Sequence, residues 1–346
     1  MKPRRIASLA FALILAAASV QGQSKITLKI ASVAPARSPW DIEQRALAQE
    51  WNKITGGLVN IVFFDATALG GEKGVIQKFR SVRPGQKAPL DGVIFTTIGM
   101  HELAPAASLY TYSMPFLIRS QGELDFVFKA HDDRLKKAFR DAGFESLAWT
   151  NVGWLSFYTK DRFANLDELK KIKIASAGLD SPILGDTFRA GGFNIEDIQA
   201  AKLLQALKGG NLRGFFGVHM YAYVTGFSKT ISWALDTKLC PVMAGVLLSN
   251  EAWAQIPAQY HPEMREAIAR MKVRLDAALE DTDRAYMQSM IDEGVKPIRP
   301  TEAELADWEA KFNRDIEIAN KTAPGAFDMK LYGELRSLLS TYRDRE

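Results

Sequence analysis

The feature that most constrains the fold is a short apolar run that ends in a turn of small residues and leads into a helix. The run covers residues 169–174, the turn covers residues 175–180, and Gly191 with Gly192 stops the helix before the next apolar segment. This order is typical of α/β proteins, in which a strand leads into a helix. Ligands of open α/β sheets bind outside the carboxyl ends of the strands, so Ala175 and Ser176 are candidate ligand contacts.

A second unit of the same kind lies near the start of the chain. Residues 25–31 alternate between polar and apolar side chains and predict a strand. Residues 40–54 have helical spacing and end at a glycine pair, after which residues 58–64 predict the next strand. Two strands joined through one helix are expected to be parallel, with a right-handed crossover.

The length of the chain predicts two lobes. It has 346 residues, 47% of them hydrophobic, which is enough for a sizeable core. Apolar residues recur at a spacing of three to four over residues 262–293 and predict one long helix. We predict lobe I over residues 24–150 plus 236–260, lobe II over residues 151–235, and C-terminal helices over residues 261–346, with the long helix bracing both lobes.

The first 22 residues have the pattern of a secretory signal peptide. Three cations precede an apolar run over residues 6–20, and the small residue Gly22 is a plausible cleavage position. A retained membrane anchor is the alternative, but the run is short for a membrane span. Removing the signal lowers the formal charge from +4 to +1. We therefore predict a periplasmic protein, and the near-neutral mature chain argues against a nucleic-acid partner.

The sequence contains no recognisable catalytic or metal-binding motif. Its histidines, His101, His131, His219 and His261, lack metal-ligand spacing, and no nucleophile elbow or phosphate loop is present. The single cysteine, Cys240, lies in an apolar run and is expected to be a buried, inert thiol. We predict no enzyme, no cofactor and no metal, with a periplasmic hydrolase built from scattered residues as the enzymatic alternative.

Several segments in a fixed order resemble the DctP-type solute-binding proteins (P subunits) of tripartite ATP-independent periplasmic (TRAP) transporters. The resemblance covers nearly all of the mature chain. It implies an α/β fold of two lobes hinged around a central cleft, a long bracing helix, and delivery of a captured solute to a membrane permease. The segments are Ala34-Pro35-Ala36-Arg37-Ser38-Pro39, Leu69-Gly70-Gly71-Glu72, Leu90-Asp91-Gly92-Val93, residues 114–119, residues 165–174, and Ser249-Asn250-Glu251-Ala252-Trp253 followed by Ile256-Pro257.

The chain departs from this family at positions that contact the ligand in members that bind organic acids. Such members have an arginine directly after the Lys-Ile strand, where this chain has Ala175. A second arginine follows a Gly-aromatic pair, and after Gly153-Trp154 this chain has Leu155. A polar Gln-Glu-Asn run corresponds to residues 215–217, which are Phe-Phe-Gly. At the positions where the resemblance leads us to expect two cations and three polar contacts, this chain therefore has apolar or small residues.

These departures predict a hydrophobic or amphipathic ligand, such as a fatty acid, a lipid-like molecule or a branched apolar compound. A carboxylate that enters a closed cleft loses hydration worth several kcal/mol, which a guanidinium usually offsets. One alternative is an organic acid held by a relocated cation from Arg37, Arg119 or Lys73. Another is a scaffold without a ligand, and simple core packing is the alternative for the phenylalanine pair.

The predicted ligand contacts combine the residues at strand ends with the positions named by the resemblance. They are Trp40, Thr96, Phe116, Trp154, Leu155, Ala175, Ser176, Phe215, Phe216, Gly217 and Tyr221.

The expected protein partners are the permease subunits and, by resemblance alone, an added periplasmic helical-repeat protein of the TPR type.

Overall fold

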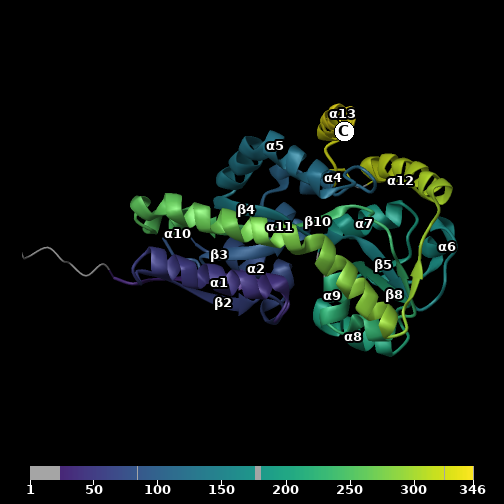
Figure 1. Ribbon diagram of the computed structural model, residues 1–346, viewed down its shortest axis with the longest axis horizontal. Coiled ribbons are helices and arrows are strands. Elements are labelled where there is room, and N and C mark those ends of the chain that lie inside the picture. The colour runs from purple at the N-terminus through teal and green to yellow at the C-terminus, as the bar shows by residue number, and fades with distance from the viewer. Residues whose placement is uncertain (1–23, 84, 176–180, 323, 346) are drawn as a thin grey trace, which may run out of the picture.

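The computed structural model describes residues 24–83, 85–175, 181–322 and 324–345. It has two lobes, each built on one mixed sheet and covered by helices (Figure 1). The predicted signal peptide and the candidate contact Ser176 lie outside the described residues. Among the described residues, none of the helices combines the length and the apolar character needed to cross a membrane.

Lobe I is built on a five-stranded sheet with the order β2-β1-β3-β10-β4. Strand β1 is parallel to both β2 and β3, whereas β10 is antiparallel to β3 and β4. The predicted strand–helix–strand unit is thus present with the expected parallel pairing. The strands are β1 (Ile26–Ser32), β2 (Val59–Asp65), β3 (Gly92–Thr96), β4 (Phe144–Trp154) and β10 (Pro241–Ser249).

Helices cover both faces of this sheet. Helix α1 begins after Ser38, whose side chain accepts a hydrogen bond from the Asp41 N–H (3.2 Å). Pro39 occupies the first turn of the helix, so the cap and the proline together fix where α1 starts after β1. The helices of lobe I are α1 (Pro39–Ile54), α2 (Gly71–Arg80), α3 (Thr97–Leu103), α4 (Leu109–Tyr112), α5 (Gln121–Asp141) and α10 (Asn250–Gln255).

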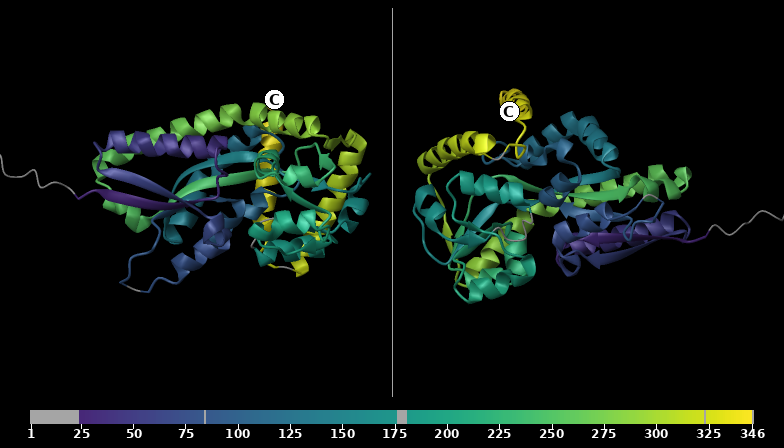
Figure 2. Two further views of the ribbon diagram at one scale, coloured as in Figure 1. Left: turned by 90° about the horizontal axis from the view of Figure 1, so that it is seen from below. Right: turned by 180° about the vertical axis from the view of Figure 1, so that it is seen from behind.

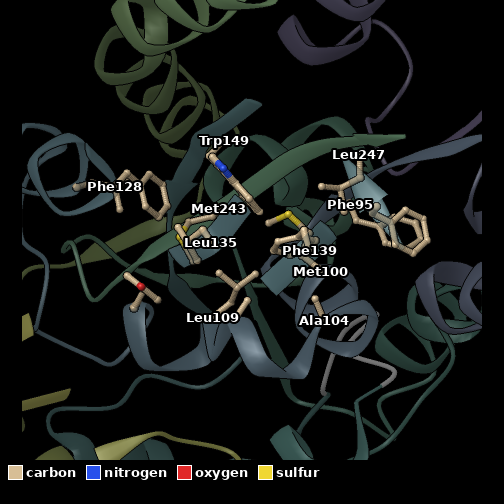
Figure 3. Packing of buried hydrophobic residues seen from close by; sticks show 14 of the residues in the cluster. Phe95, Met100, Ala104, Leu109, Phe128, Leu135, Phe139, Trp149, Met243 and Leu247 are labelled. Atoms are coloured by element: carbon tan, nitrogen blue, oxygen red, sulfur yellow. The ribbon is translucent and has the colours of Figure 1, made fainter. Parts of the chain in front are cut away.

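The main core of lobe I lies between the sheet and the helices α3, α4 and α5. Figure 3 shows the rings of Phe128, Phe139 and Trp149 packed with Met243 and Leu135. Phe139 and Trp149 have ring centroids 4.8 Å apart. Large side chains of this kind each contribute roughly 1.5–3 kcal/mol by burial, which holds the short helices α3 and α4 against the sheet.

Lobe II is built on a six-stranded sheet with the order β11-β9-β5-β8-β6-β7. The central strand β8 is parallel to β6 and antiparallel to β5. The strands are β5 (Ser156–Thr159), β6 (Ile174–Ala175), β7 (Ile195–Glu196), β8 (Gly214–Gly217), β9 (Trp233–Leu235) and β11 (Lys296–Ile298), and the helices are α6 (Leu166–Lys171), α7 (Pro182–Ala190), α8 (Ala200–Lys208) and α9 (His219–Val224).

The strand predicted over residues 169–174 is shorter in the structure. Asn165 accepts a hydrogen bond from the Glu168 N–H (3.0 Å) and caps α6, so residues as far as Lys171 are helical. The strand itself covers only Ile174 and Ala175. The cap therefore overrides the local β preference of the isoleucines.

The long helix α11 (His261–Asp292) braces both lobes, as the sequence predicts. Its first half packs against α1 and β4 of lobe I, and its second half packs against α9 of lobe II. Met264 and Met271 lie in a core of lobe I, whereas Met287 and Met290 lie in a core of lobe II. Figures 1 and 2 show the helix crossing the junction between the lobes.

The segment after α11 returns through lobe II to lobe I. It consists of β11, α12 (Glu302–Thr322) and α13 (Met329–Arg343), so the predicted C-terminal helices also contribute a strand to the second sheet. Thr301 and Glu304 exchange hydrogen bonds at the start of α12, which is the predicted capping box. Strand β4 stays in the sheet of lobe I as far as Trp154, beyond the boundary predicted at residue 150.

Helix α13 is attached to lobe I through an ion pair between the half-buried Arg343 and the buried Glu123. Arg343 Nε donates to Glu123 Oε1 (2.7 Å), and an NH2 group of the same guanidinium donates to the Leu117 carbonyl (2.8 Å). We expect Arg343→Met to lower the free energy of unfolding by about 1–3 kcal/mol, because Glu123 stays buried with one partner fewer. Urea unfolding measures the change, with Arg336→Met on the exposed side of α13 as the control. Equal effects of the two substitutions would contradict the prediction.

Candidate functional site

A cavity of about 280 Å³ lies at the junction of the two lobes. Lobe I contributes the ends of β3 and β10, and lobe II contributes the end of β8 and one side of α7. Helix α12 adds a further wall. The residues with side chains at these walls include Trp40, Ile94, Thr96, Tyr110, Leu155, Phe188, Phe193, Phe216, Tyr221, Val242, Phe312 and Asp315.

The described lining of this cavity is mostly apolar and contains two carboxylates, Glu72 and Asp315. Among the described residues that line it, there is no lysine, arginine or histidine. Four aromatic rings from separate parts of the chain pack together at one wall. Phe216 and Phe188 have ring centroids 4.8 Å apart, and Phe193 and Phe312 have centroids 6.0 Å apart. A ligand here is enclosed mainly by carbon atoms.

The structure brings six of the predicted contact residues to this cavity. Their roles in binding stay predictions. The residues are Trp40, Thr96, Leu155, Phe216, Gly217 and Tyr221. Ala175 is fully buried in β6 between its neighbours β7 and β8 and is not among the lining residues, because it belongs to the core of lobe II with Tyr158 and Phe215.

The adjacent rings of Phe215 and Phe216 have different environments. Both lie within β8, so they point to opposite faces of the sheet. Phe215 stacks on Tyr158 with ring centroids 4.8 Å apart, inside the core of lobe II. The expectation that both rings face the ligand requires the strand to end at Gly214, and it continues to Gly217. Phe215 is therefore corrected to a core residue.

Two more predicted contacts lie away from the cavity. Phe116 has a positive φ of 62°, and its N–H donates to the Leu239 carbonyl (2.7 Å), which turns the ring into the core against Phe312. Trp154 ends β4 with its ring facing Lys238, whose Nζ is 5.3 Å from the ring centroid. Trp154 lines a separate polar cavity beside α11 instead.

None of the three proposed replacement cations is among the residues that line the cavity. Arg119 forms an ion pair with Glu309 (2.8 Å) and donates to the Phe116 carbonyl, so its guanidinium is engaged elsewhere. Arg37 has a positive φ of 66°, and its N–H donates to Asp41. Neither Arg37 nor Lys73 supplies a cation to the described lining.

Glu72 places a fixed carboxylate at the start of α3. Its oxygens accept hydrogen bonds from the Thr96 N–H (2.6 Å), the Thr96 hydroxyl (3.0 Å) and the Gly99 N–H (3.1 Å). These donors belong to the positive end of a helix, where an anion is stabilised. A bound anion cannot use the same N–H groups, because a side chain of the protein already does.

Asp315 on α12 is the second carboxylate of the lining, and it is paired. Lys170 Nζ lies 2.6 Å from Asp315 Oδ2, and both side chains are largely buried. Burial raises the pKa of Asp315, while the neighbouring Lys170 opposes the shift. The pair adds no net charge, and Glu72 is the other carboxylate of the described lining.

Sequence reasoning missed Tyr110, Phe188, Phe193 and Phe312 as lining residues. Phe188 and Phe193 follow the small-residue turn that the sequence marks as a candidate ligand site. Their place in the sequence could therefore have indicated that they line the cavity. Phe312 is separated by long stretches of chain from the walls that β3, β8 and β10 provide, and only the return of α12 brings it there.

The family model of the DctP proteins, described as bacterial extracellular solute-binding protein, family 7, matches residues 30–322. The chain belongs to this family. The family is one of extracellular solute-binding proteins and not of enzymes. It agrees with the resemblance found in the sequence.

Solved structures of TRAP periplasmic solute-binding proteins have the same fold. One from Desulfovibrio salexigens, with bound orotic acid, is 17% identical with a TM-score of 0.76 and covers 90% of this chain and 99% of its own. One from Ralstonia eutropha, with bound acetolactate, is 17% identical with a TM-score of 0.78 and covers 91% and 99%. One from Sulfurospirillum deleyianum, with bound succinate, is 16% identical with a TM-score of 0.77 and covers 91% and 99%.

Proposed function

We propose that this DctP-family protein captures a small organic acid in the periplasm and delivers it to the membrane permease of a TRAP transporter. The observation that carries the proposal is the cavity between the lobes, whose walls come from both sheets and from α12. A solute enclosed by both lobes links binding to the relative position of the lobes. A TPR partner remains a prediction from the resemblance.

The ligands of the structural neighbours contradict the prediction of a hydrophobic or lipid-like solute. Those ligands are orotic acid, acetolactate and succinate, which are organic acids. The cavity agrees with this, because about 280 Å³ is near the lower end of ligand pockets and favours a small solute. The alternative of an organic acid is therefore the better one.

The apolar walls favour an acid with a compact branched or aromatic skeleton and one carboxyl group. The rings of Phe188, Phe193, Phe216 and Phe312 offer burial to such a skeleton. No described cation neutralises the carboxylate, so neutral donors must replace its hydration. A second carboxylate on the ligand adds a further desolvation cost and repulsion from Glu72.

Affinity for such an acid is expected to change little with salt. Screening weakens contacts between charges, whereas burial of an apolar skeleton persists at high ionic strength. Titration calorimetry with phenylacetate at low and high ionic strength measures the effect. A marked fall in affinity at high salt would reveal a cation that contacts the ligand and would contradict this prediction.

The proposed function is tested by purification from the periplasm without denaturation, followed by native mass spectrometry of the carried molecule. Calorimetric titration then compares phenylacetate, benzoate and isovalerate with the corresponding amides and with palmitate. We expect at least one of the short acids to bind more tightly than its amide and palmitate not to bind. Binding of palmitate in preference to every short acid, or of no acid at all, would overturn the proposal.

A further inference from the structure

Strand β2 forms one edge of the lobe I sheet and lacks the charge, proline and short length that usually protect such an edge (Figure 1). The edges of the lobe II sheet have this protection: β7 has two residues, and β11 has three, including Lys296 and Pro297. The other edge of the lobe I sheet, β4, packs against α5 and α11. By contrast, β2 has seven residues, and the first six carry no charge.

The backbone of β2 offers free hydrogen-bonding groups along this edge. The Val59 N–H donates to the Thr55 hydroxyl (3.0 Å), and the Val59 carbonyl accepts from the Asn52 amide (3.0 Å), so both groups face away from β1. Alternate residues of a paired strand direct these groups to the same side, so those of Ile61 and Phe63 also face outward. No hydrogen bond joins these outward groups to the described part of the chain.

The face of β2 that points away from α1 exposes apolar side chains. Ile61 and Phe63 pack toward the core that contains Leu47 of α1. Because side chains alternate along a strand, Val62 and Phe64 point to the opposite face, where they are 39% and 37% exposed. An uncharged strand with exposed apolar residues and free backbone groups is a template for pairing with another extended chain.

The exposed face beside this edge is basic. Lys29 on β1 is the register partner of Val62, so its side chain lies on the same face, and Lys25 precedes it at an alternate position. Lys87 lies close to the same strand, because its Nζ is 3.7 Å from Asp91, which also accepts the Lys29 N–H (2.9 Å). Neither Lys25 nor Lys29 forms an ion pair with a described carboxylate.

We propose that the β2 edge of lobe I docks an extended acidic segment of a protein partner, which adds to the sheet as a further strand beside β2. Neighbouring strands are about 4.8 Å apart, so the added strand lies about 10 Å from β1. The side chains of a glutamate and Lys29 together span this distance over Val62. A second copy of this chain would bring lysines to this face, and a membrane surface would leave the backbone groups of Ile61 and Phe63 unpaired.

The test measures binding of a synthetic peptide of alternating glutamate and valine, about as long as β2, by the purified protein. Its glutamates can face the lysines while its valines pack beside Ile61 and Phe63. We expect at least about tenfold tighter binding than for the same peptide with lysine in place of glutamate. Hydrogen exchange at the amides of Ile61 and Phe63 is expected to slow when the acidic peptide binds, because both N–H groups become donors.

Val62→Glu places a carboxylate at the centre of the edge and is expected to weaken binding of the acidic peptide by at least about tenfold. Val273→Glu makes the same change at a residue of α11 that is 65% exposed, and it is expected to leave the affinity unchanged. Equal effects of the two substitutions would overturn the inference.

Three further results would also overturn it. These are no binding of the acidic peptide by the unsubstituted protein, equal binding of the lysine peptide, and amide exchange at Ile61 and Phe63 that the acidic peptide does not slow. If the peptide does not bind and Val62→Glu abolishes self-association in sedimentation, the occupant is a second copy. If it abolishes binding to phosphatidylglycerol vesicles instead, the occupant is a membrane. The proposed function stands in each case, because no residue of β2 lines the cavity.

Discussion

Replacing Phe215 with alanine is expected to lower the free energy of unfolding by about 3–5 kcal/mol, the usual cost of deleting a ring from a core. Phe215 is fully buried, stacks on Tyr158 and meets Phe227 edge-on at 5.6 Å. None of these contacts involves the cavity. The affinity of the folded variant for an acid that the unsubstituted protein binds is therefore expected to stay the same.

Phe216→Ala is the matched variant, one residue further along the same strand. Its ring lies at the cavity wall, so its loss is expected to weaken binding about thirtyfold, corresponding to roughly 2 kcal/mol of lost burial. The loss of stability is expected to be smaller than for Phe215→Ala, because one side of the ring faces a void. Urea unfolding and ligand titration of both variants measure the contrast. Similar behaviour of the two variants would contradict the assignment of opposite faces.

Asp283→Asn is expected to stabilise the protein at alkaline pH by up to about 4 kcal/mol. Asp283 lies on α11 beside the Gly153 backbone, and its Oδ2 is 4.0 Å from His219 Nε2. Burial raises the pKa of Asp283 to about 7, with Asp236 and Glu280 adding to the shift and Lys238 opposing it. Burial also lowers the pKa of His219 to about 4, so His219 is neutral and offers no compensating charge.

The direction of the pH dependence follows from the proton balance of this carboxyl group. Between its ordinary pKa of 3.8 and about 7, the folded protein holds a proton that the unfolded chain has released. Its contribution to stability therefore falls as the pH rises through this window and levels off above pH 7. Urea unfolding over the pH range measures this decline, which Asp283→Asn should remove. Asp281→Asn, at an exposed position on the same helix, is the control, and an equal change there would refute the assignment.

Local patterns in the sequence were sufficient for the elements that depend on periodicity. The spacing of Met264, Met271, Leu275 and Met290 predicts α11 almost residue for residue, because one face of a helix must stay apolar along its length. The first strand–helix–strand unit is equally well marked by its glycine stop. The strand ends and the resemblance together named six residues that line the cavity.

The face of the sheet on which a side chain lies, and the cavity that it reaches, depend on strand register and on long-range contacts. Local sequence patterns do not contain this information. Phe215 and Phe216 exchange roles if the strand shifts by one residue. Tyr110 and Phe312 come to one cavity only because α4 packs beside α3 of lobe I and α12 packs against α7 of lobe II. The compensation of Glu72 by donors at the start of α3 has no signal in the sequence.

The path of the chain sets the order in which the protein can be assembled. Lobe I contains the earliest strands, but Leu331, Leu335 and Leu339 of the 15-residue helix α13 complete its core. During synthesis these side chains emerge after all five strands of the lobe, so lobe I lacks part of its interior until α13 has been made. Native packing of the N-terminal lobe therefore depends on a segment synthesised after the whole of lobe II.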